Sequence, residues 1–159
     1  MLTLISNSLA ETERLGNKIG ENLPQGTIIL LSGEMGSGKT TLTKSICASQ
    51  GIDPMSVTSP TYTIANVYEA EQNIHHVDLY RLNSEDELDG FDRDDLISPD
   101  GLTLIEWPEF IEPLLGKEPL LSIKMAALSD NERQLVINFR QGTFDTLQEA
   151  LKNDACLKH

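Results

Sequence analysis

The sequence predicts an α/β fold of three layers, in which helices cover both faces of a mixed, largely parallel sheet and antiparallel hairpins extend that sheet. Two nearly continuous apolar runs, residues 27–32 and 102–106, are typical of strands buried on both faces, as in parallel sheets. A glycine-rich loop and a helical segment follow the first run, and this order favours a parallel crossover. A short, turn-forming link separates 61–69 from 74–80, which predicts an antiparallel hairpin.

Local patterns place the other elements. Ser8 and Glu11 match a capping box, and the leucine and isoleucine stripe that follows continues a helix to residue 23. A second helix is expected over 39–50, and Gly51 suits its C′ position. The remaining expected elements are, in chain order, a strand over 3–6, short acidic helices over 84–88 and 92–96, a short helix over 108–115, a hairpin of strands 120–127 and 133–140, and a helix over 143–153.

Length and composition favour one globular domain. The chain has 159 residues, so we expect a single domain over 1–159 whose tail after about residue 153 is disordered. No window approaches the ~18 apolar residues that a membrane span needs, and the first residues lack the basic region of a signal peptide. We therefore expect a cytoplasmic protein without membrane contact, in which Cys47 and Cys156 are reduced thiols.

The net charge argues against direct binding of nucleic acid. There are 25 acidic and 12 basic residues, which give a net charge of −13. Such a chain repels polyphosphate backbones at long range, so direct binding of DNA or RNA is disfavoured. If the protein acts on a nucleic acid, a partner protein would have to make the contact.

Residues 33–40 fit the phosphate-loop pattern G-x-x-x-x-G-K-[ST] at every fixed position. Glycines let backbone N–H groups converge on phosphate oxygens, and the next helix adds the positive end of its dipole. Lys39 is expected to reach the β- and γ-phosphates, Thr40 to bind Mg²⁺ and Thr41 to meet the α-phosphate. The residues expected to bind a nucleoside triphosphate here are Glu34, Met35, Gly36, Ser37, Gly38, Lys39, Thr40 and Thr41.

Two carboxylates could complete a hydrolytic site. Hydrolysis needs a group that holds the far side of the metal and orients water. Glu106 ends the apolar run 102–106, and Asp78 ends the run 74–78. A strand-end acid that faces water is the alternative reading, but both runs look buried, and a buried charge needs a partner. We therefore predict Lys39, Glu106 and Asp78 as catalytic residues, and Thr40, Glu106 and Asp78 as metal ligands.

Four further features stay open between a functional role and a structural one. Trp107 follows Glu106 directly, and it either packs in the core or covers the nucleotide. Thr61 is either a switch threonine that meets the γ-phosphate or Mg²⁺, or part of a proline-shaped loop. Arg81 could pair with phosphate or form a surface salt bridge. The acids within 85–95 form either a solvated surface or a docking surface for a basic partner.

The absence of a guanine-recognition motif and the small number of arginines indicate which nucleotide and which reaction to expect. A GTPase would need an Asn-Lys-x-Asp guanine reader, and the nearest match, Asn17-Lys18, lacks the acid and precedes the phosphate loop. ATP, with ADP as product, is therefore favoured. The chain has few arginines, which argues against a small-molecule kinase with a lid and acceptor site. That kinase, and a nucleotide-binding regulatory module without useful catalysis, remain the alternatives.

Four motifs resemble those of the TsaE (YjeE) family in order and spacing. They are residues 33–42, the Ser-Pro-Thr-Tyr of 59–62, the His-Val-Asp-Leu-Tyr-Arg of 76–81 and the Ile-Glu-Trp-Pro of 105–108. The segment from Glu11 to Gly16 also resembles the family's N-terminal Thr-x-x-Leu-Gly element. The resemblance spans about residues 6–140, and the last three motifs are far more specific than the phosphate loop.

This resemblance implies a P-loop NTPase-like fold and a small bacterial ATPase. Such proteins support synthesis of N6-threonylcarbamoyladenosine (t6A) at position 37 of tRNAs that read codons beginning with A. They act on the TsaD–TsaB complex, and their ATPase activity lets the modification cycle turn over without transferring the threonylcarbamoyl group itself. The resemblance further implies that Thr40 and Glu106 hold Mg²⁺, that Asp78 supports the site, and that Glu11 and Thr12 lie near the adenine. Contact with tRNA would be indirect.

Overall fold

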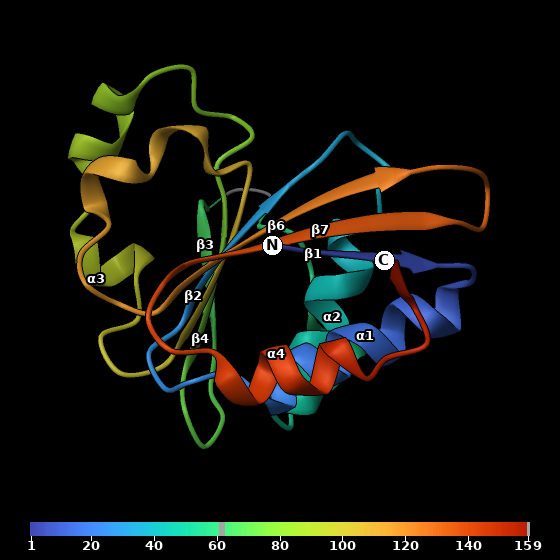
Figure 1. Cartoon of the computed structure of the whole chain (residues 1–159). Helices are drawn as coiled ribbons and strands as arrows, with labels where there is room; N and C mark the ends of the chain where they lie inside the picture. Colours follow the sequence, from blue (N-terminus) through green and yellow to red (C-terminus); the bar gives the residue numbers. More distant parts are fainter. Residues whose placement is uncertain (61–62, 159) are drawn as a thin grey trace.

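The computed structural model describes residues 1–60 and 63–158, which form an eight-stranded sheet with helices on both faces (Figure 1). The strands are β1 (Leu2–Ser6), β2 (Ile28–Ser32), β3 (Ala65–Tyr68), β4 (Ile74–Asp78), β5 (Leu102–Glu106), β6 (Leu120–Ala127), β7 (Arg133–Gln141) and β8 (Leu157–Lys158). The α-helices are α1 (Leu9–Glu21), α2 (Lys39–Ser49), α3 (Arg93–Leu96) and α4 (Asp145–Lys152). The 3₁₀ helices are η1 (Pro54–Ser56), η2 (Glu85–Gly90), η3 (Pro108–Phe110) and η4 (Glu112–Leu114). Across the described residues, every helix is too short or too polar to span a bilayer.

The sheet is parallel at its centre and antiparallel at its edges. The strand order is β3-β4-β5-β2-β6-β7-β1-β8, and β4, β5, β2 and β6 run in one direction. The other strands join by antiparallel pairing. The α/β class, the layers and both hairpins are confirmed, although the parallel part is smaller than expected. Parallel pairs need long crossover connections, and only the four central strands have them.

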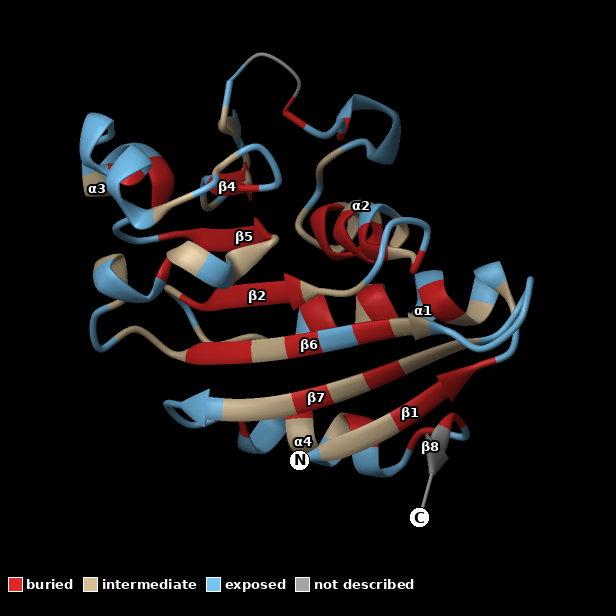
Figure 2. Ribbon diagram, turned by 90° about the horizontal axis from the view of Figure 1, so that it is seen from above, coloured by how far each residue is buried: buried red, intermediate tan, exposed pale blue. Residues whose placement is uncertain are grey.

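Two cores lie on opposite faces of this sheet. Ile29 and Leu31 of β2 point into a core covered by α1, α2 and α4, whereas Ile28 and Leu30 point into a second core covered by α3, η2 and the segment of η3 and η4. Figure 2 shows β2 and β5 buried along their length, with helices on both sides of the sheet. The prediction of strands buried on both faces is thus confirmed for 28–31 and 102–106.

Two glycines bring α1 very close to α2. A Cβ on Gly16 would lie 2.5 Å from Cβ of Ser45, and a Cβ on Gly20 would lie 1.9 Å from Oγ of Ser49. A Cβ on Gly16 would meet a Cβ that cannot rotate away, and a Cβ on Gly20 would require the Ser49 hydroxyl to move, so the glycines let α1 pack this closely. This packing holds the start of α1, including Thr12, beside the start of α2, where the phosphate loop ends.

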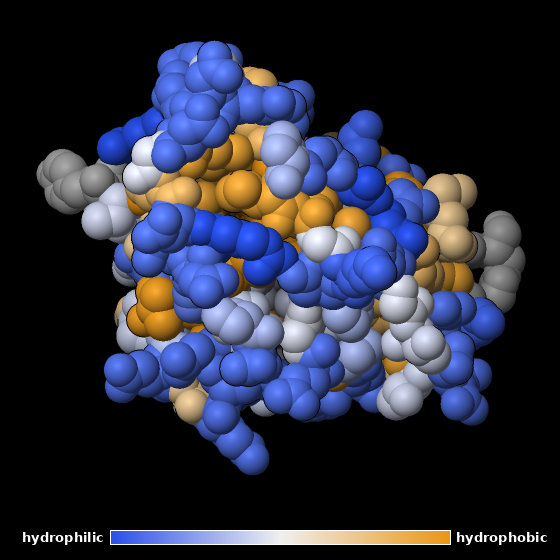
Figure 3. Space-filling view, turned by 90° about the vertical axis from the view of Figure 1, so that its left-hand side faces the viewer, coloured by the Kyte–Doolittle hydropathy of each residue, from blue (hydrophilic) through white to orange (hydrophobic). Residues whose placement is uncertain are grey.

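The second face carries an acidic surface. Every acidic residue within 85–95 is exposed, and none lines the cavities at the phosphate loop. Figure 3 shows this side of the molecule, where hydrophilic side chains border a band of hydrophobic ones. Leu82, Phe110, Leu114 and Leu115 pack on the second core and remain partly exposed there. Their exposure agrees with both readings of these acids, a solvated surface and a docking surface for a basic partner.

Some elements differ from expectation. Only Ala65–Tyr68 of the predicted strand 61–69 pairs with β4, and residues 61 and 62 lie outside the described part of the chain. Segment 108–115 forms two 3₁₀ helices instead of one α-helix. Pro113 explains the second change, because a proline within an α-helix removes a backbone donor and clashes with the preceding turn.

Asp154 fixes the C-terminal tail to α1. Its buried carboxylate accepts hydrogen bonds from Arg14 and Lys18, each at 2.5 Å. The hydrogen bond from Arg14 is the main reason why the pKa of Asp154 lies well below its usual range. Beyond it, β8 pairs with β1, and Ile5 N–H donates to the Cys156 carbonyl at 2.8 Å. The expectation of a disordered tail is therefore wrong for residues 154–158.

Replacing Asp154 with asparagine is expected to lower the free energy of unfolding at pH 7 by about 1.5–3 kcal/mol, the range for hydrogen bonds to charged groups. Because the folded-state pKa is depressed, this contribution is fully present above about pH 4, the unfolded-state value, and is lost as the pH falls toward the folded-state pKa. Urea unfolding should show that the difference in unfolding free energy between wild type and Asp154→Asn is smaller at pH 3 than at pH 7. Asp86→Asn, on the exposed η2, is the control, and an equal gap at both pH values would contradict this account.

Both cysteines are buried free thiols. Burial raises the pKa of Cys47 to about 12 and that of Cys156 to about 11. Cys156 lies in the first core and not in an exposed polar tail as its sequence context suggested. Neither thiol is available as a nucleophile near neutral pH.

Candidate functional site

The phosphate loop, residues 33–38, joins the end of β2 to the start of α2. Gly33, Gly36 and Gly38 have φ values of 145°, 80° and 104°, in the region that L side chains rarely adopt. A Cβ on Gly33 would also lie 2.3 Å from the carbonyl oxygen of Met125, so β6 leaves no room for a side chain. The glycines that the motif prescribes are thus required by the shape of this loop.

Donor groups without protein acceptors lie in the loop and at the start of α2. The Ser37 hydroxyl is buried and has no hydrogen-bond partner among the described residues. Gly38 caps α2 without a side-chain hydrogen bond, so the first N–H groups of α2 are not capped by a side chain. A buried donor without a protein acceptor beside a helix N-terminus suits a phosphate oxygen.

Lys39 crosses the loop. Its Nζ donates to the carbonyls of Gly33 at 2.7 Å and Glu34 at 3.0 Å, and it lies 4.4 Å from the centre of the Trp107 ring. Burial lowers the pKa of Lys39, and the charges of Glu106 and Asp78 act in the opposite direction. A buried ammonium of this kind is already desolvated and held at the loop mouth, where a phosphate would replace the carbonyls as acceptor.

Asp78 and Glu106 end neighbouring parallel strands, and they lie directly opposite each other in the register. Glu106 is 3 % exposed, and its Oε1 accepts from Thr43 at 3.4 Å and contacts His76 Nε2 at 3.0 Å. Its Oε2 has no partner among the described residues. Asp78 Oδ1 accepts from the Tyr80 N–H at 2.9 Å. The two predicted carboxylates therefore face one end of the sheet together, as the sequence indicated.

A polar chain runs from Glu106 to the loop that follows η1. His76 is fully buried, and its Nδ1 lies 3.4 Å from the Tyr68 hydroxyl. That hydroxyl accepts from the Thr58 N–H at 3.2 Å and lies 3.1 Å from the Thr58 carbonyl. The orientation of the Glu106 carboxylate is thus tied to the segment that contains Ser59, which lines the same cavity.

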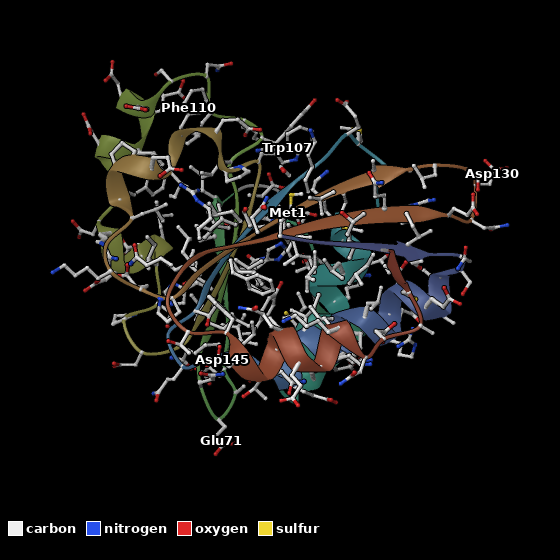
Figure 4. All side chains as sticks on the ribbon, in the orientation of Figure 1. Met1, Glu71, Trp107, Phe110, Asp130 and Asp145 are labelled. Atoms are coloured by element: carbon white, nitrogen blue, oxygen red, sulfur yellow. The ribbon has the colours of Figure 1, made fainter. Side chains whose placement is uncertain are left out.

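Trp107 has an unusual backbone. It is the only non-glycine residue with positive φ in the described chain, at 55°, although its N–H still continues the sheet by donating to Leu31 at 3.1 Å. Such a conformation is strained for a tryptophan. It turns the indole toward Lys39 and Tyr80, whose ring centre lies 4.9 Å away, at the same end of the sheet as the phosphate loop (Figure 4). Trp107 therefore lies over the loop and not in the core.

Two adjacent cavities meet at this end of the sheet. Nine predicted residues line the larger one, of about 390 Å³: Met35, Gly36, Gly38, Lys39, Thr40, Thr41, Asp78, Glu106 and Trp107. Ser59, Tyr80 and Arg133 line it as well. Thr12 lines the smaller cavity, of about 140 Å³, with Leu9, Asp130 and Asn131. Gly38, Thr41 and Arg133 line both cavities, so they mark the passage between them.

The structure does not bring every predicted residue to these cavities. Glu34 and Ser37 line a hollow on the outer side of the loop, although the Ser37 hydroxyl is buried. The Glu11 carboxylate accepts from the Asn7 N–H at 2.7 Å, so it caps α1 instead of facing a cavity. Thr61 lies outside the described residues. Arg81 is exposed, lines neither cavity and has no ion pair within the described chain.

Sequence reasoning missed Arg133 and Tyr80 as lining residues and Thr43 as a partner of Glu106. Arg133 was visible only as the first residue of the last hairpin strand. Its position depends on β6 pairing with β2 in parallel, which local patterns do not reveal. Thr43 lies one helical turn after Lys39, so the spacing could have placed it on the face of α2 toward the sheet.

Replacing Asp78 with asparagine is expected to stabilise the nucleotide-free protein. Burial, with the nearby Glu106 charge, raises the pKa of Asp78 in the folded protein. Ionising Asp78 therefore costs more in the folded than in the unfolded state, and the protein loses stability as the pH rises and Asp78 ionises. At pH 7 the variant should melt roughly 2–4 °C higher, the shift that about 1 kcal/mol causes in a chain of this size. The gain should shrink below about pH 4, where Asp78 is protonated in both states. Asp100→Asn, at an exposed loop, is the control, and a lower melting temperature for Asp78→Asn would contradict this reasoning.

Comparison with protein families identifies one match. The family described as threonylcarbamoyl adenosine biosynthesis protein TsaE matches residues 6–135 of this chain. Its matching region includes the phosphate loop, both strand-end carboxylates and Arg133.

Individual relatives give the same result. A Treponema pallidum protein named tRNA threonylcarbamoyladenosine biosynthesis protein TsaE is 30% identical over 84% of this chain and 97% of its own length. A Synechocystis protein of the same name is 39% identical over 67% of this chain and 69% of its own length. Among solved structures, the crystal structure of YdiB from Bacillus subtilis matches with a TM-score of 0.71 at 26% identity, covering 95% of this chain and 93% of the other.

Proposed function

Because this chain belongs to the TsaE family, which serves threonylcarbamoyladenosine biosynthesis in tRNA, we propose that it binds Mg–ATP and hydrolyses it in support of t6A formation. The hydrolysis would act on the TsaD–TsaB complex in the cytoplasm. Binding to tRNA would be indirect, since a net charge of −13 opposes direct contact with a polyphosphate chain.

One observation carries this proposal. The phosphate-loop residues Lys39 and Thr40 share a single cavity with Asp78 and Glu106, which end adjacent parallel strands. A phosphate cradle alone supports binding, but a cradle that faces two carboxylates also supports metal binding and the placement of water. The smaller cavity beside it lacks this combination.

The triphosphate would lie in the larger cavity. The first N–H groups of α2 would donate to its oxygens, and Lys39 would exchange its two carbonyl acceptors for the β- and γ-phosphates. Trp107 and Tyr80 form one wall and limit the access of bulk water. A site with less water strengthens these charged hydrogen bonds.

The donor set fits magnesium. Thr40, Asp78 and Glu106 present oxygen atoms, which Mg²⁺ prefers, and they would hold it together with water and phosphate oxygens. Within the described chain, no group of three His, Cys, Asp or Glu residues forms a metal site by itself, and Mg²⁺ sites in nucleotide enzymes seldom need one. When bound, the ion would neutralise charge on the β- and γ-phosphates.

Glu106 is the residue best placed to orient the attacking water. Thr43 and His76 both contact Oε1, which fixes the carboxylate and leaves Oε2 to accept a proton-bearing water. Water would attack the γ-phosphorus, the bond to the bridging oxygen would break, and the products would be ADP, inorganic phosphate and a proton. Positioning of this kind accounts for most catalysis in phosphoryl transfer.

The smaller cavity is the candidate site for adenine. Thr12 and Asn131 supply side-chain hydrogen-bonding groups, while Leu9 supplies an apolar contact. Its place beyond Gly38 and Thr41, on the side of α1, agrees with the expectation that Thr12 lies near the base.

The experiment is a measurement of binding and turnover with and without partners. Titration with Mg–ATP should show magnesium-dependent binding, and hydrolysis should be slow alone and faster with TsaD–TsaB and tRNA. An absence of magnesium-dependent ATP binding with all partners present would refute the proposal. Transfer of labelled phosphate to small molecules would indicate a kinase instead, and binding without stimulated turnover would indicate a regulatory module.

A further inference from the structure

The hairpin formed by β6 and β7 extends beyond the phosphate loop. β2 ends at Ser32, which pairs with Lys124, whereas β6 continues to Ala127 before the chain turns. The turn of residues 128–132 therefore projects past the end of β2, and Figure 4 shows Asp130 at its tip. Arg133, the first residue of β7, returns from this turn toward the start of α2.

Arg133 is anchored by one end of its guanidinium. Nη1 donates to the carbonyls of Ser129 at 2.8 Å, Asp130 at 3.2 Å and Glu132 at 3.0 Å. These acceptors belong to the turn itself, so the side chain is held over its own hairpin. An anchored guanidinium loses little conformational freedom when a ligand arrives.

The other end of the guanidinium lies at the passage between the two cavities. A Cβ on Gly38 would lie 3.6 Å from Arg133 Nε, so the side chain rests against the last glycine of the phosphate loop. Nε and Nη2 have no hydrogen-bond partner among the described residues, and no described carboxylate forms an ion pair with Arg133. Three N–H donors thus remain for a ligand.

The charges that line the larger cavity also point to this residue. Its described lining contains two cations, Lys39 and Arg133, against Asp78 and Glu106. Lys39 lies at the mouth of the phosphate loop, so Arg133 is the cation on the side of the smaller cavity.

We propose that Arg133 binds the α-phosphate of the nucleotide through Nε and Nη2, while Nη1 stays on the turn. Arg133 would then be a specificity-determining residue: it makes affinity depend on the α-phosphate and joins the phosphate site to the base site. This inference rests on the proposed nucleotide binding, because it assigns a ligand group to the passage between the two cavities.

The test compares Arg133→Gln with wild type for two ligands, ADP and adenosine, in the presence of Mg²⁺. ADP affinity should fall about 10- to 100-fold, the effect of losing charged hydrogen bonds, and adenosine affinity should change less than about 2-fold. Arg140→Gln is the matched control, since Arg140 lies on the same strand, is exposed and pairs with Glu112. It should bind both ligands like wild type.

A purely structural role of Arg133 gives a different result. If Arg133 only shapes the hairpin, the glutamine variant should lose ADP and adenosine affinity by the same factor, and that outcome would overturn the inference. Unchanged ADP affinity would overturn it as well. If wild type itself binds neither ligand, the proposed function fails and not this assignment alone.

Phosphorus NMR of bound ADP gives a second readout that does not depend on the glutamine variant folding. Arg133→Lys keeps a cation but not the guanidinium fork, and it should lose affinity by about 3- to 10-fold. The α-phosphorus resonance should shift relative to wild type, and the β-phosphorus resonance should stay. Identical spectra and identical ADP affinity in this variant would refute contact with the α-phosphate.

Discussion

Lys39→Ala is expected to weaken Mg–ATP binding at least about 100-fold. Lys39 as a residue is 6 % exposed, and its ammonium already lies where two carbonyls and the Trp107 ring fix it. Two charged hydrogen bonds to phosphate, at about 1.5–3 kcal/mol each, correspond to a factor of roughly 10² or more. Isothermal titration with Mg–ATP measures the loss directly.

Lys44→Ala is the matched control for this variant. Lys44 lies on the same helix but lines neither cavity, so its removal should change ATP affinity by less than about 2-fold after screening. Burial lowers the pKa of Lys39, which means that its charge is costly in the nucleotide-free fold. Lys39→Ala should therefore melt no lower than wild type, and near-normal ATP binding by a folded Lys39→Ala protein would remove the basis of the proposed function.

Glu106→Gln is expected to separate binding from hydrolysis. The amide keeps the shape of the side chain and can still accept from Thr43, but it loses the negative charge that orients water and helps hold the metal. Turnover with the full set of partners should fall about 10²- to 10³-fold, comparable to the loss of one group that stabilises a transition state. ATP affinity should stay within about 3-fold, since the phosphate cradle is untouched.

The control for this variant lies three residues further along. Glu109 is exposed on η3 and does not line the larger cavity, so Glu109→Gln should hydrolyse ATP like wild type. Single-turnover measurements distinguish the chemical step from product release. A Glu106→Gln protein with normal single-turnover rates would show that another group orients the water, and Asp78 would be the next residue to replace.

The parts of the fold that the sequence predicts are those set by local chemistry. The phosphate loop needs glycine at fixed positions, and β2 and β5 are buried on both faces and therefore continuously apolar. Each of these elements can be recognised from a sequence pattern of a few residues. Asp78 and Glu106 could be paired in advance because both end apolar strands, and parallel strands end at the same edge. Each of these inferences uses one segment and one rule.

Other features depend on which segments meet in space. Arg133 becomes a lining residue only because β6 pairs beside β2 and extends beyond it. Asp154 is buried only because α1 presents Arg14 and Lys18 to it. Glu11 had two sequence-based roles, a helix cap and a neighbour of the adenine, and the structure places its carboxylate on the cap. Strand order and tail docking are long-range properties that periodicity does not encode.

The strained backbone at Trp107 gives this protein a built-in optical reporter. Trp107 is the only tryptophan of the chain, and its ring lies against the Lys39 ammonium and the Tyr80 ring. Emission excited selectively from indole therefore originates at the wall of the phosphate cavity and nowhere else in the molecule. Ligand arrival, metal exchange and partner docking at this end of the sheet can all be followed on the unmodified protein, without attaching a dye.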